Sequence, residues 1–284
     1  MSALQAILLG AIQGLTEFIP ISSSAHLLIL RWFFGWGSQD VAFDAVIHLG
    51  TLAALLLFFW REWSEMIRAY FATTRLARIT GVGKYIPAAS QGSPMLLWPV
   101  VLACVPAGLT GVIFEDTVNE RFRSAPLLTG AVLILLGLLL FAADRIGAKN
   151  RPMHSVRMRD WLIIGLAQAL AFVPGVSRSG ITITAGLFCG LEREASARFS
   201  FLLGAPIIFG AGLYELKKML STGVSGGQAL PLLLGFLTAT IVGFACVKFL
   251  IGYLRKRSVG LFVVYRVVLG MAVIAAFFAH WLRV

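Results

Sequence analysis

Long stretches without charged residues divide the chain into apolar segments. Asp, Glu, Lys and Arg are absent from residues 95–114, 125–143, 199–214, 229–247 and 267–282, and residues 43–60 contain only Asp44 and the titratable His48. A helix needs about 20 consecutive apolar residues to cross a bilayer. The pattern therefore predicts an all-α polytopic membrane protein with six transmembrane helices, and it excludes a soluble domain. The longest polar connection, 61–94, is expected to be a loop.

Two further apolar regions each contain one charge near the middle. Residues 1–30 hold only Glu17, and residues 161–191 hold only Arg178. Both regions are longer than one crossing needs, and both have Pro and Ser beside the charge. Because Pro breaks a helix and frees main-chain polar groups, each region is predicted to form two short helices around a turn. Such a region is either a re-entrant hairpin or a broken span.

The basic residues of the connections distinguish these two arrangements. Lys and Arg number five in 61–94, five in 144–159 and three in 251–260, but two each in 115–124 and 215–228. Cytoplasmic connections carry the excess of Lys and Arg. If residues 161–191 enter and leave on the same side, all three basic connections face the cytoplasm, whereas a single crossing would separate them. This favours a hairpin, and the similar pattern of residues 1–34 favours a second.

Three predicted spans separate the two hairpins, so the hairpins open toward opposite sides. The sequence thus predicts an inverted-topology repeat within one membrane domain, 1–284, with repeat one at about 1–143 and repeat two at about 160–284. Four residues recur 155 positions later, namely Gly10, Gln13, Ser22 and Ser24 as Gly165, Gln168, Ser177 and Ser179. Inverted repeats place broken helices near the membrane midplane, where Glu17 and Arg178 are expected to share one polar cavity.

The net charge of +11 changes little in this interpretation. In a soluble chain it would indicate nucleic acid, but here Lys and Arg between spans set the orientation, so we expect no nucleic-acid partner. The three cysteines, Cys104, Cys189 and Cys246, lie in apolar stretches without metal-ligand spacing and are expected to be packing residues. Membrane lipids are the expected surroundings, and a homodimer stays open.

The polar residues around the two isolated charges indicate a functional site. A charge at bilayer depth costs about 2.5–3.5 kcal/mol, and an ion pair that only holds the halves together needs no further polar company. The accompanying polar residues are Gln13, Ser22, Ser23, Ser24, His26, Ser177, Ser179 and Thr182. A guanidinium with hydroxyls and amides at a helix N-terminus suits phosphate oxygens, so residues 174–182 are predicted to form a phosphate cradle.

Side chains suited to catalysis are expected on the other side of the predicted cavity. Ser23, His26 and Glu17 supply a nucleophile, an imidazole and a carboxylate, which together fit phosphoryl transfer. Simpler roles stay open: a helix cap for the serines and a hydrogen-bonded core position for His26. His48 and Asp44 are expected at most to line the cavity. Glu17 with Gln13 is a candidate ligand set for a divalent cation, Mg²⁺ or Ca²⁺. A secondary transporter or flippase for an anionic lipid or phosphate-bearing substrate is the alternative function.

Two motifs make a resemblance specific. Residues 13–26, QGLTEFIPISSSAH, resemble the Glu/Gln-x-x-x-Glu motif and following Ser/His segment of the bacterial undecaprenyl-diphosphate phosphatase family, which is associated with bacitracin resistance. Residues 174–182, PGVSRSGIT, match its Pro-Gly-x-Ser-Arg-Ser-x-x-Thr motif. The residues that match family positions implicated in activity are Glu17, Ser23, His26, Ser177, Arg178 and Thr182. Gln13 stands where many members have Glu, which leaves Glu17 as the only carboxylate of the motif.

The resemblance implies hydrolysis of a C55 polyprenyl diphosphate to the monophosphate and inorganic phosphate, which recycles the lipid carrier for cell-wall synthesis. It also implies a site that faces the outer side of the bacterial inner membrane and a divalent metal that promotes activity. The nucleophile stays open among Ser23, His26 and a water molecule with Glu17 as base.

Overall fold

The fold is helical throughout the part of the chain that is described. The computed structural model describes residues 1–36, 41–80, 97–121, 125–222 and 229–281. These ranges contain no β-strand, only one isolated bridge between Arg151 and Leu191. The predicted all-α class is therefore confirmed.

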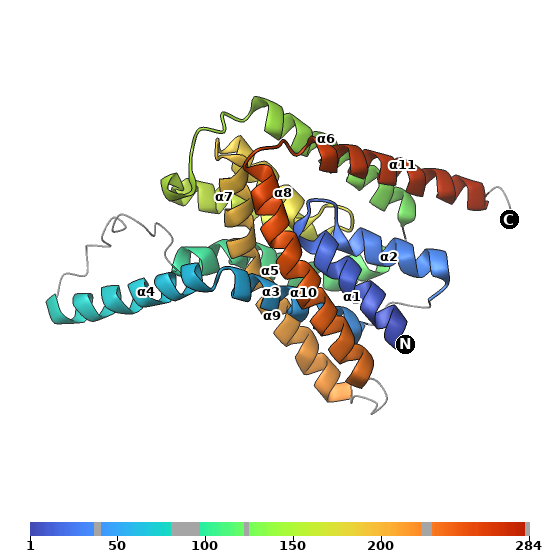
Figure 1. Ribbon diagram of the computed structural model, residues 1–284, viewed down its shortest axis with the longest axis horizontal. Coiled ribbons are helices and arrows are strands. Elements are labelled where there is room, and N and C mark those ends of the chain that lie inside the picture. The colour runs from blue at the N-terminus through green and yellow to red at the C-terminus, as the bar shows by residue number, and fades with distance from the viewer. Residues whose placement is uncertain (37–40, 81–96, 122–124, 223–228, 282–284) are drawn as a thin grey trace.

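Figure 1 shows how the eleven α-helices of these ranges are arranged. They are α1 (Ala3–Phe18), α2 (Ser23–Phe34), α3 (Val41–Phe58), α4 (Trp60–Thr80), α5 (Leu97–Arg121), α6 (Pro126–Ile146), α7 (Met158–Gln168), α8 (Arg178–Phe188), α9 (Arg193–Thr222), α10 (Ala229–Leu254) and α11 (Gly260–Trp281). Short 3₁₀ turns, η1 (Met153–Ser155) and η2 (Ala169–Phe172), precede and follow α7.

Both interrupted apolar regions fold as two short helices around a turn, as the sequence predicts. α1 ends before Pro20 and α2 begins at Ser23, while η2 ends before Pro174 and α8 begins at Arg178. The residue before each second helix is a serine in the left-handed region, with φ of 75° at Ser22 and 68° at Ser177. A non-glycine residue pays a conformational cost there, of about 1–3 kcal/mol. Both turns therefore have the same strained geometry at the same place.

The helices of the two halves exchange packing partners. α1 packs chiefly on α10 of the second half, and α7 packs chiefly on α5 of the first. Both contacts are close because of matched glycines: a Cβ at Gly10 would lie 2.5 Å from the carbonyl oxygen of Gly235, and one at Gly165 would lie 2.5 Å from that of Ala103. α6 and α11 pack on each other along the top of Figure 1. Neither half therefore forms a separate core.

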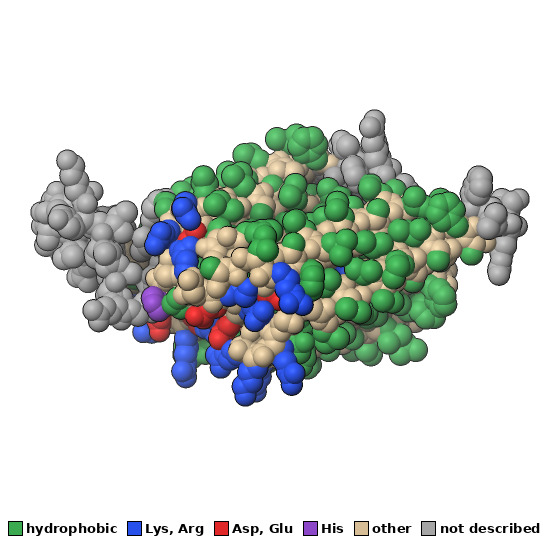
Figure 2. All heavy atoms as spheres, turned by 90° about the horizontal axis from the view of Figure 1, so that it is seen from above, with side chains coloured by type: hydrophobic (Ala, Val, Ile, Leu, Met, Phe, Trp, Pro, Cys, Tyr) green, Lys and Arg blue, Asp and Glu red, His purple; other side chains and the backbone are tan. Residues whose placement is uncertain are grey.

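The described helices include four that are long and apolar enough to cross a membrane, or five if α3 and the start of α4 form one bent span. The four are Pro126–Ile146, Arg193–Lys217, Ala229–Leu254 and Gly260–Ala279. α3 and α4 meet at 75°, and the apolar part of α5, Val100–Phe114, is shorter. Figure 2 shows hydrophobic side chains over much of the face on the side of α6 and α11.

The connection 61–94 is not simply a loop, contrary to prediction. α4 continues through its first part to Thr80, while residues 81–96 lie outside the described ranges. Between Trp60 and Thr80 there is no Pro or Gly, so nothing ends the helix even though the segment is polar. Low hydropathy was therefore a poor guide to helix content here.

Three ion pairs gather the basic connections around the N-terminal end of α9. Arg198 pairs with Glu62 of α4, Arg193 Nε lies 2.5 Å from Asp144 Oδ1 at the end of α6, and Glu194 Oε1 lies 2.8 Å from Arg255 after α10. Lys and Arg side chains collect at one end of the face in Figure 2, away from the apolar area. The connections that carry most Lys and Arg thus begin at one end of the molecule.

Candidate active site

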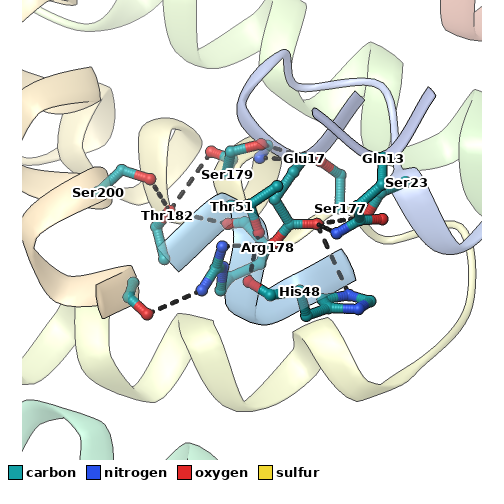
Figure 3. Close-up of polar contacts among 12 residues, drawn as sticks. Gln13, Glu17, Ser23, His48, Thr51, Ser177, Arg178, Ser179, Thr182 and Ser200 are labelled. Carbon is teal, nitrogen blue, oxygen red and sulfur yellow. Dashed lines mark hydrogen bonds and ion pairs between the residues drawn. The ribbon is translucent and has the colours of Figure 1, made fainter. Parts of the chain in front are cut away.

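Glu17, in the last turn of α1, is the centre of a polar cluster contributed by both broken regions and by α3 (Figure 3). Its Oε1 accepts a hydrogen bond from Arg178 Nη2 at 2.5 Å. Its Oε2 accepts from Ser23 Oγ at 2.5 Å and from Gln13 Nε2 at 3.0 Å. The carboxylate is buried, with 7% of its side chain exposed. One carboxylate thus contacts a cation on one oxygen and a hydroxyl on the other.

Arg178 reaches Glu17 from the first residue of α8. The two residues lie 161 positions apart in the chain, and their contact brings together the two charges that were expected to share one cavity. The other terminal nitrogen, Nη1, donates to the carbonyl oxygen of Gly204 at 2.9 Å. A Cβ at Gly204 would lie 2.9 Å from that nitrogen, so the glycine leaves room for the guanidinium. Arg178 is 17% exposed, which places its charge at the boundary of the buried cluster.

The hydroxyls at the start of α8 make contacts near their own turn. Ser177 Oγ accepts from the N–H of Gly180 at 3.2 Å and lies 3.2 Å from Ser179 Oγ, just as Ser22 Oγ lies 3.2 Å from Ser24 Oγ in the first turn. Ser179 Oγ also donates to the carbonyl oxygen of Ile19 at 3.3 Å, which joins the two turns. The predicted cradle residues therefore lie together beside Arg178.

Thr182 makes its described contacts with α8 and α9 rather than with the Glu17 carboxylate. Its hydroxyl donates to the carbonyl oxygen of Arg178 at 2.7 Å and lies 2.6 Å from Ser200 Oγ of α9. Ser200 lies in the uncharged stretch 199–214 and was not among the predicted site residues. Thr182 fixes the first turn of α8, on which Arg178 stands.

His26 has its partners outside the Glu17 cluster. Nδ1 lies 2.7 Å from the carbonyl oxygen of Ser22, and Nε2 lies 2.7 Å from the hydroxyl of Tyr265 in α11. The two rings are stacked, with centroids 5.6 Å apart and planes 8° from parallel. His26 therefore supports the serine turn from behind, and its predicted part in proton transfer stays a prediction.

His48 is the imidazole that lies beside the carboxylate. Its Nε2 is 3.9 Å from Glu17 Oε2, and its Nδ1 is 2.7 Å from the carbonyl oxygen of Asp44. A bond from Nδ1–H to a carbonyl leaves Nε2 as the basic nitrogen on the side of Glu17. The carboxylate of Asp44 instead forms a buried ion pair with Arg31 of α2, with Nη1 and Oδ2 2.9 Å apart. The expectation that His48 lines the cavity fits this geometry.

Arg266 of α11 is a buried residue that the sequence reasoning missed. Its guanidinium is fully enclosed and donates to main-chain carbonyls of both broken turns. Arg266 borders the apolar stretch 267–282, but the residues before it, 259–265, are also uncharged. A lone Arg inside a long apolar helix was therefore the signal, as it was for Arg178.

The residues around Glu17 offer few ligands for a metal. Within the described ranges no group of three His, Cys, Asp or Glu residues could hold an ion. Gln13 Oε1 is nevertheless buried without a hydrogen-bond partner, next to the Glu17 carboxylate. A carboxylate and an amide oxygen fit a hard cation only when water and substrate oxygens complete its shell.

Comparisons with known proteins identify the family of the chain. The family described as "Bacitracin resistance protein BacA" matches residues 6–272. "Undecaprenyl-diphosphatase" of Moorella thermoacetica is 46% identical over 283 residues and covers all of both chains. The protein of the same name from Thermomicrobium roseum is 44% identical, covering 96% of this chain and 98% of its own. That of Trichormus variabilis is 41% identical and is covered over 86% of its length. This chain belongs to the BacA bacitracin resistance protein family.

Proposed function

We propose that this protein is a membrane phosphatase that hydrolyses undecaprenyl diphosphate to undecaprenyl phosphate and inorganic phosphate. The observation that carries the proposal is the contact of one buried carboxylate with both a serine hydroxyl and an arginine, since these are the parts of phosphoryl transfer. Relatives 41–46% identical over nearly the full chain carry the name undecaprenyl-diphosphatase. The apolar helices give the polyprenyl tail a membrane environment.

In the proposed reaction Ser23 Oγ attacks the terminal phosphorus of the diphosphate. Glu17 Oε2 accepts the hydroxyl proton, for which the 2.5 Å contact is already in place. The new O–P bond replaces the bridging P–O bond, and undecaprenyl phosphate leaves. Water then hydrolyses the phosphoserine and releases inorganic phosphate. Direct attack by water with Glu17 as base gives the same products.

Arg178 supplies the positive charge that this reaction needs. In the structure its guanidinium is paired with Glu17 and held by the Gly204 carbonyl. A planar guanidinium binds two phosphate oxygens as readily as a carboxylate. The entering diphosphate therefore competes with Glu17 for Arg178, which releases Glu17 to accept the proton from Ser23.

A divalent cation, Mg²⁺ or Ca²⁺, belongs to the proposal as a partner of Glu17. Glu17 and the unpaired Gln13 Oε1 would hold it, together with diphosphate oxygens. When bound, such an ion neutralises charge on the diphosphate. The position of Gln13 fits this role, because its amide nitrogen already donates to Glu17 while its oxygen is unused.

The proposed membrane arrangement is six spans and two re-entrant hairpins, with inverted halves and a site that faces the outer side of the bacterial inner membrane. Its support is the set of ion pairs that gathers Glu62, Asp144 and Arg255 at the N-terminal end of α9. If this end is cytoplasmic, the connections with most Lys and Arg obey the positive-inside rule. The turns that hold Ser23 and Arg178 lie between the two halves.

The test is phosphate release from undecaprenyl diphosphate by purified protein in detergent, where no gradient exists. We expect turnover by the wild type and loss of about 10²–10³ in kcat for Arg178→Lys, which keeps the charge but not the planar fork. Lysine is preferable to alanine here, because alanine would leave Glu17 buried without a cation and would threaten the fold. No turnover in detergent, together with lipid flux in proteoliposomes, would show a transporter instead.

A further inference from the structure

Arg266 connects the two broken turns through their main chains. Its Nη1 donates to the carbonyl oxygen of Pro20 at 3.1 Å, in the first turn. Its Nη2 donates to Gly175 at 2.9 Å and to Val176 at 3.2 Å, in the second turn. Its Nε donates to Leu133 of α6 at 3.1 Å. One side chain thus fixes three segments that are far apart in the sequence.

The space around Arg266 is shaped by two glycines. A Cβ at Gly137 of α6 would lie 3.2 Å from Arg266 Cβ, and a Cβ at Gly180 of α8 would lie 2.9 Å from its Nη1. The residue is 0% exposed, and within the described ranges all five of its hydrogen bonds go to main-chain oxygens. Burying a guanidinium without a carboxylate is costly, so a simple packing role would be served better by an apolar residue.

The bonded carbonyls lie directly before the proposed reacting groups. Pro20 is three residues before Ser23, and Val176 is two residues before Arg178. Between them stand Ser22 and Ser177, both strained in the left-handed region, which a free turn would leave. The distance between Ser23 and Arg178 therefore depends on how the two turns are held together.

We propose that Arg266 is a positioning residue for the phosphatase reaction, which aligns the Ser23 turn with the Arg178 turn by bonding the carbonyls of both. The inference rests on the proposed function where it is tested by kcat. It does not rest on that function where it is tested by hydrogen–deuterium exchange of the two turns. Arg266 touches neither Glu17 nor Ser23, and it acts through Pro20, Gly175 and Val176. A lysine at this position keeps the charge but offers no planar fork to bond two turns at once.

The first experiment compares Arg266→Lys with the wild type in the detergent assay. We expect kcat to fall about 100-fold, as for other small misplacements of reacting groups, while KM stays within about threefold. Hydrogen–deuterium exchange of residues 17–24 and 174–182 is measured on the same samples, and both segments should exchange faster. A folded Arg266→Lys protein with wild-type kcat and unchanged exchange would overturn the proposal.

A second variant displaces the Arg266 side chain without replacing it. Gly137→Ala presses a methyl group against the Arg266 side chain from α6, and it should lower kcat and speed exchange in both turns. The matched control is Gly252→Ala, where an added Cβ meets nothing within 4 Å, and it should behave as the wild type. Equal behaviour of the two alanine variants contradicts the proposal, even if Arg266→Lys does not fold. If the wild type is inactive, the phosphatase function alone is refuted. Hydrogen–deuterium exchange of the two turns still shows whether Arg266 holds them together.

Discussion

The two carboxylate oxygens of Glu17 contact different groups of the proposed site. Oε1 faces the guanidinium of Arg178, and Oε2 faces the hydroxyl of Ser23. Gln13 shares Oε2 and limits how far the carboxylate rotates. The orientation of Glu17 is therefore set before any substrate enters, which lowers the reorganisation that the reaction requires.

Ser23→Ala should lower kcat at least about 100-fold, because it removes the hydroxyl that faces Glu17. The loss of stability should be small, since Ser23 is only half-buried and Gln13 still donates to the carboxylate. Phosphate release and thermal unfolding in detergent measure the two effects. Ser64→Ala is the matched control, because Ser64 is also half-buried but its hydroxyl bonds the local carbonyl of Arg61, away from the site.

The nucleophile can be identified by rapid acid quenching during turnover. If Ser23 attacks, phosphate should be recovered on Ser23 as an acid-stable ester. Phosphate on a histidine, or no covalent intermediate at all, would reject the serine route and favour His26 or water.

His26 and Tyr265 should act as one unit. Their hydroxyl–imidazole contact of 2.7 Å holds the ring behind the Ser22 carbonyl. In a double-mutant cycle, His26→Asn and Tyr265→Phe should each lower kcat, and the double variant should lose less than the sum, with a coupling of about 0.5–3 kcal/mol. Additive losses would mean that Tyr265 does not orient His26.

The sequence predicted that Glu17 and Arg178 share one polar cavity, because each was a single charge in a broken apolar stretch. It could not predict that His48 rather than His26 lies next to the carboxylate. His26 is near Ser23 in the chain, but its ring points to Tyr265, 239 positions away. Proximity along the chain does not fix the direction of a side chain, and the direction of His26 is set by its contact with Tyr265 of α11.

Among the helices, the exchange of partners between the halves is the feature with the clearest structural cause. The recurrence of Gly10 as Gly165 was visible in the sequence, but which helix each glycine approaches was not. α1 and α7 hold corresponding places in the proposed repeat, and so do their partners α10 and α5. The extent of α4 was also missed, because apolar periodicity says little about polar helices.

Gly10→Ala and Gly165→Ala should each destabilise the protein by about 1–3 kcal/mol, because the new methyl would overlap a main-chain carbonyl of the facing helix. Thermal unfolding in detergent measures the effect. Gly210→Ala in α9 is the control, since its Cβ would meet nothing within 4 Å and alanine favours a helix. If Gly10→Ala unfolds at the same temperature as Gly210→Ala, α1 and α10 are not tightly packed.

The start of α7, where the second broken region begins, should lose stability in acid. Burial alone would raise the pKa of Asp160, but the hydrogen bond from Arg151, the N–H of Arg157 and nearby positive charge lower it below the usual value. The stabilisation from ionised Asp160 is present above about pH 3.9, the pKa of this group in the unfolded chain. It is lost as the pH falls through the lower pKa that Asp160 has in the folded protein. Asp160→Asn should lower the melting temperature near pH 7 and weaken its decline in acid. The exposed Glu192→Gln is the control, and the prediction fails if both variants respond alike to pH.

For the molecule as a whole, the proposed topology can be tested by labelling single cysteines in intact cells. With Cys104, Cys189 and Cys246 replaced by alanine, a cysteine is placed at the exposed position of Arg157, Lys256 or Lys217. The first two should be labelled only after the membrane is permeabilised, and the third from outside. Labelling of Arg157→Cys and Lys256→Cys from opposite sides would mean that the second broken region crosses the membrane once.

The pairing of Glu17 with Arg178 also bears on how the protein is made. During synthesis Glu17 leaves the ribosome 161 residues before Arg178, and α1 emerges long before its packing partner α10. The first broken region therefore reaches the membrane with a carboxylate but without the cation and the helix that will enclose it. In newly made chains this segment must stay at the water-exposed membrane surface or against the insertion machinery until the second half is synthesised. Biogenesis, and not only catalysis, is thus constrained by placing the two charges in different halves.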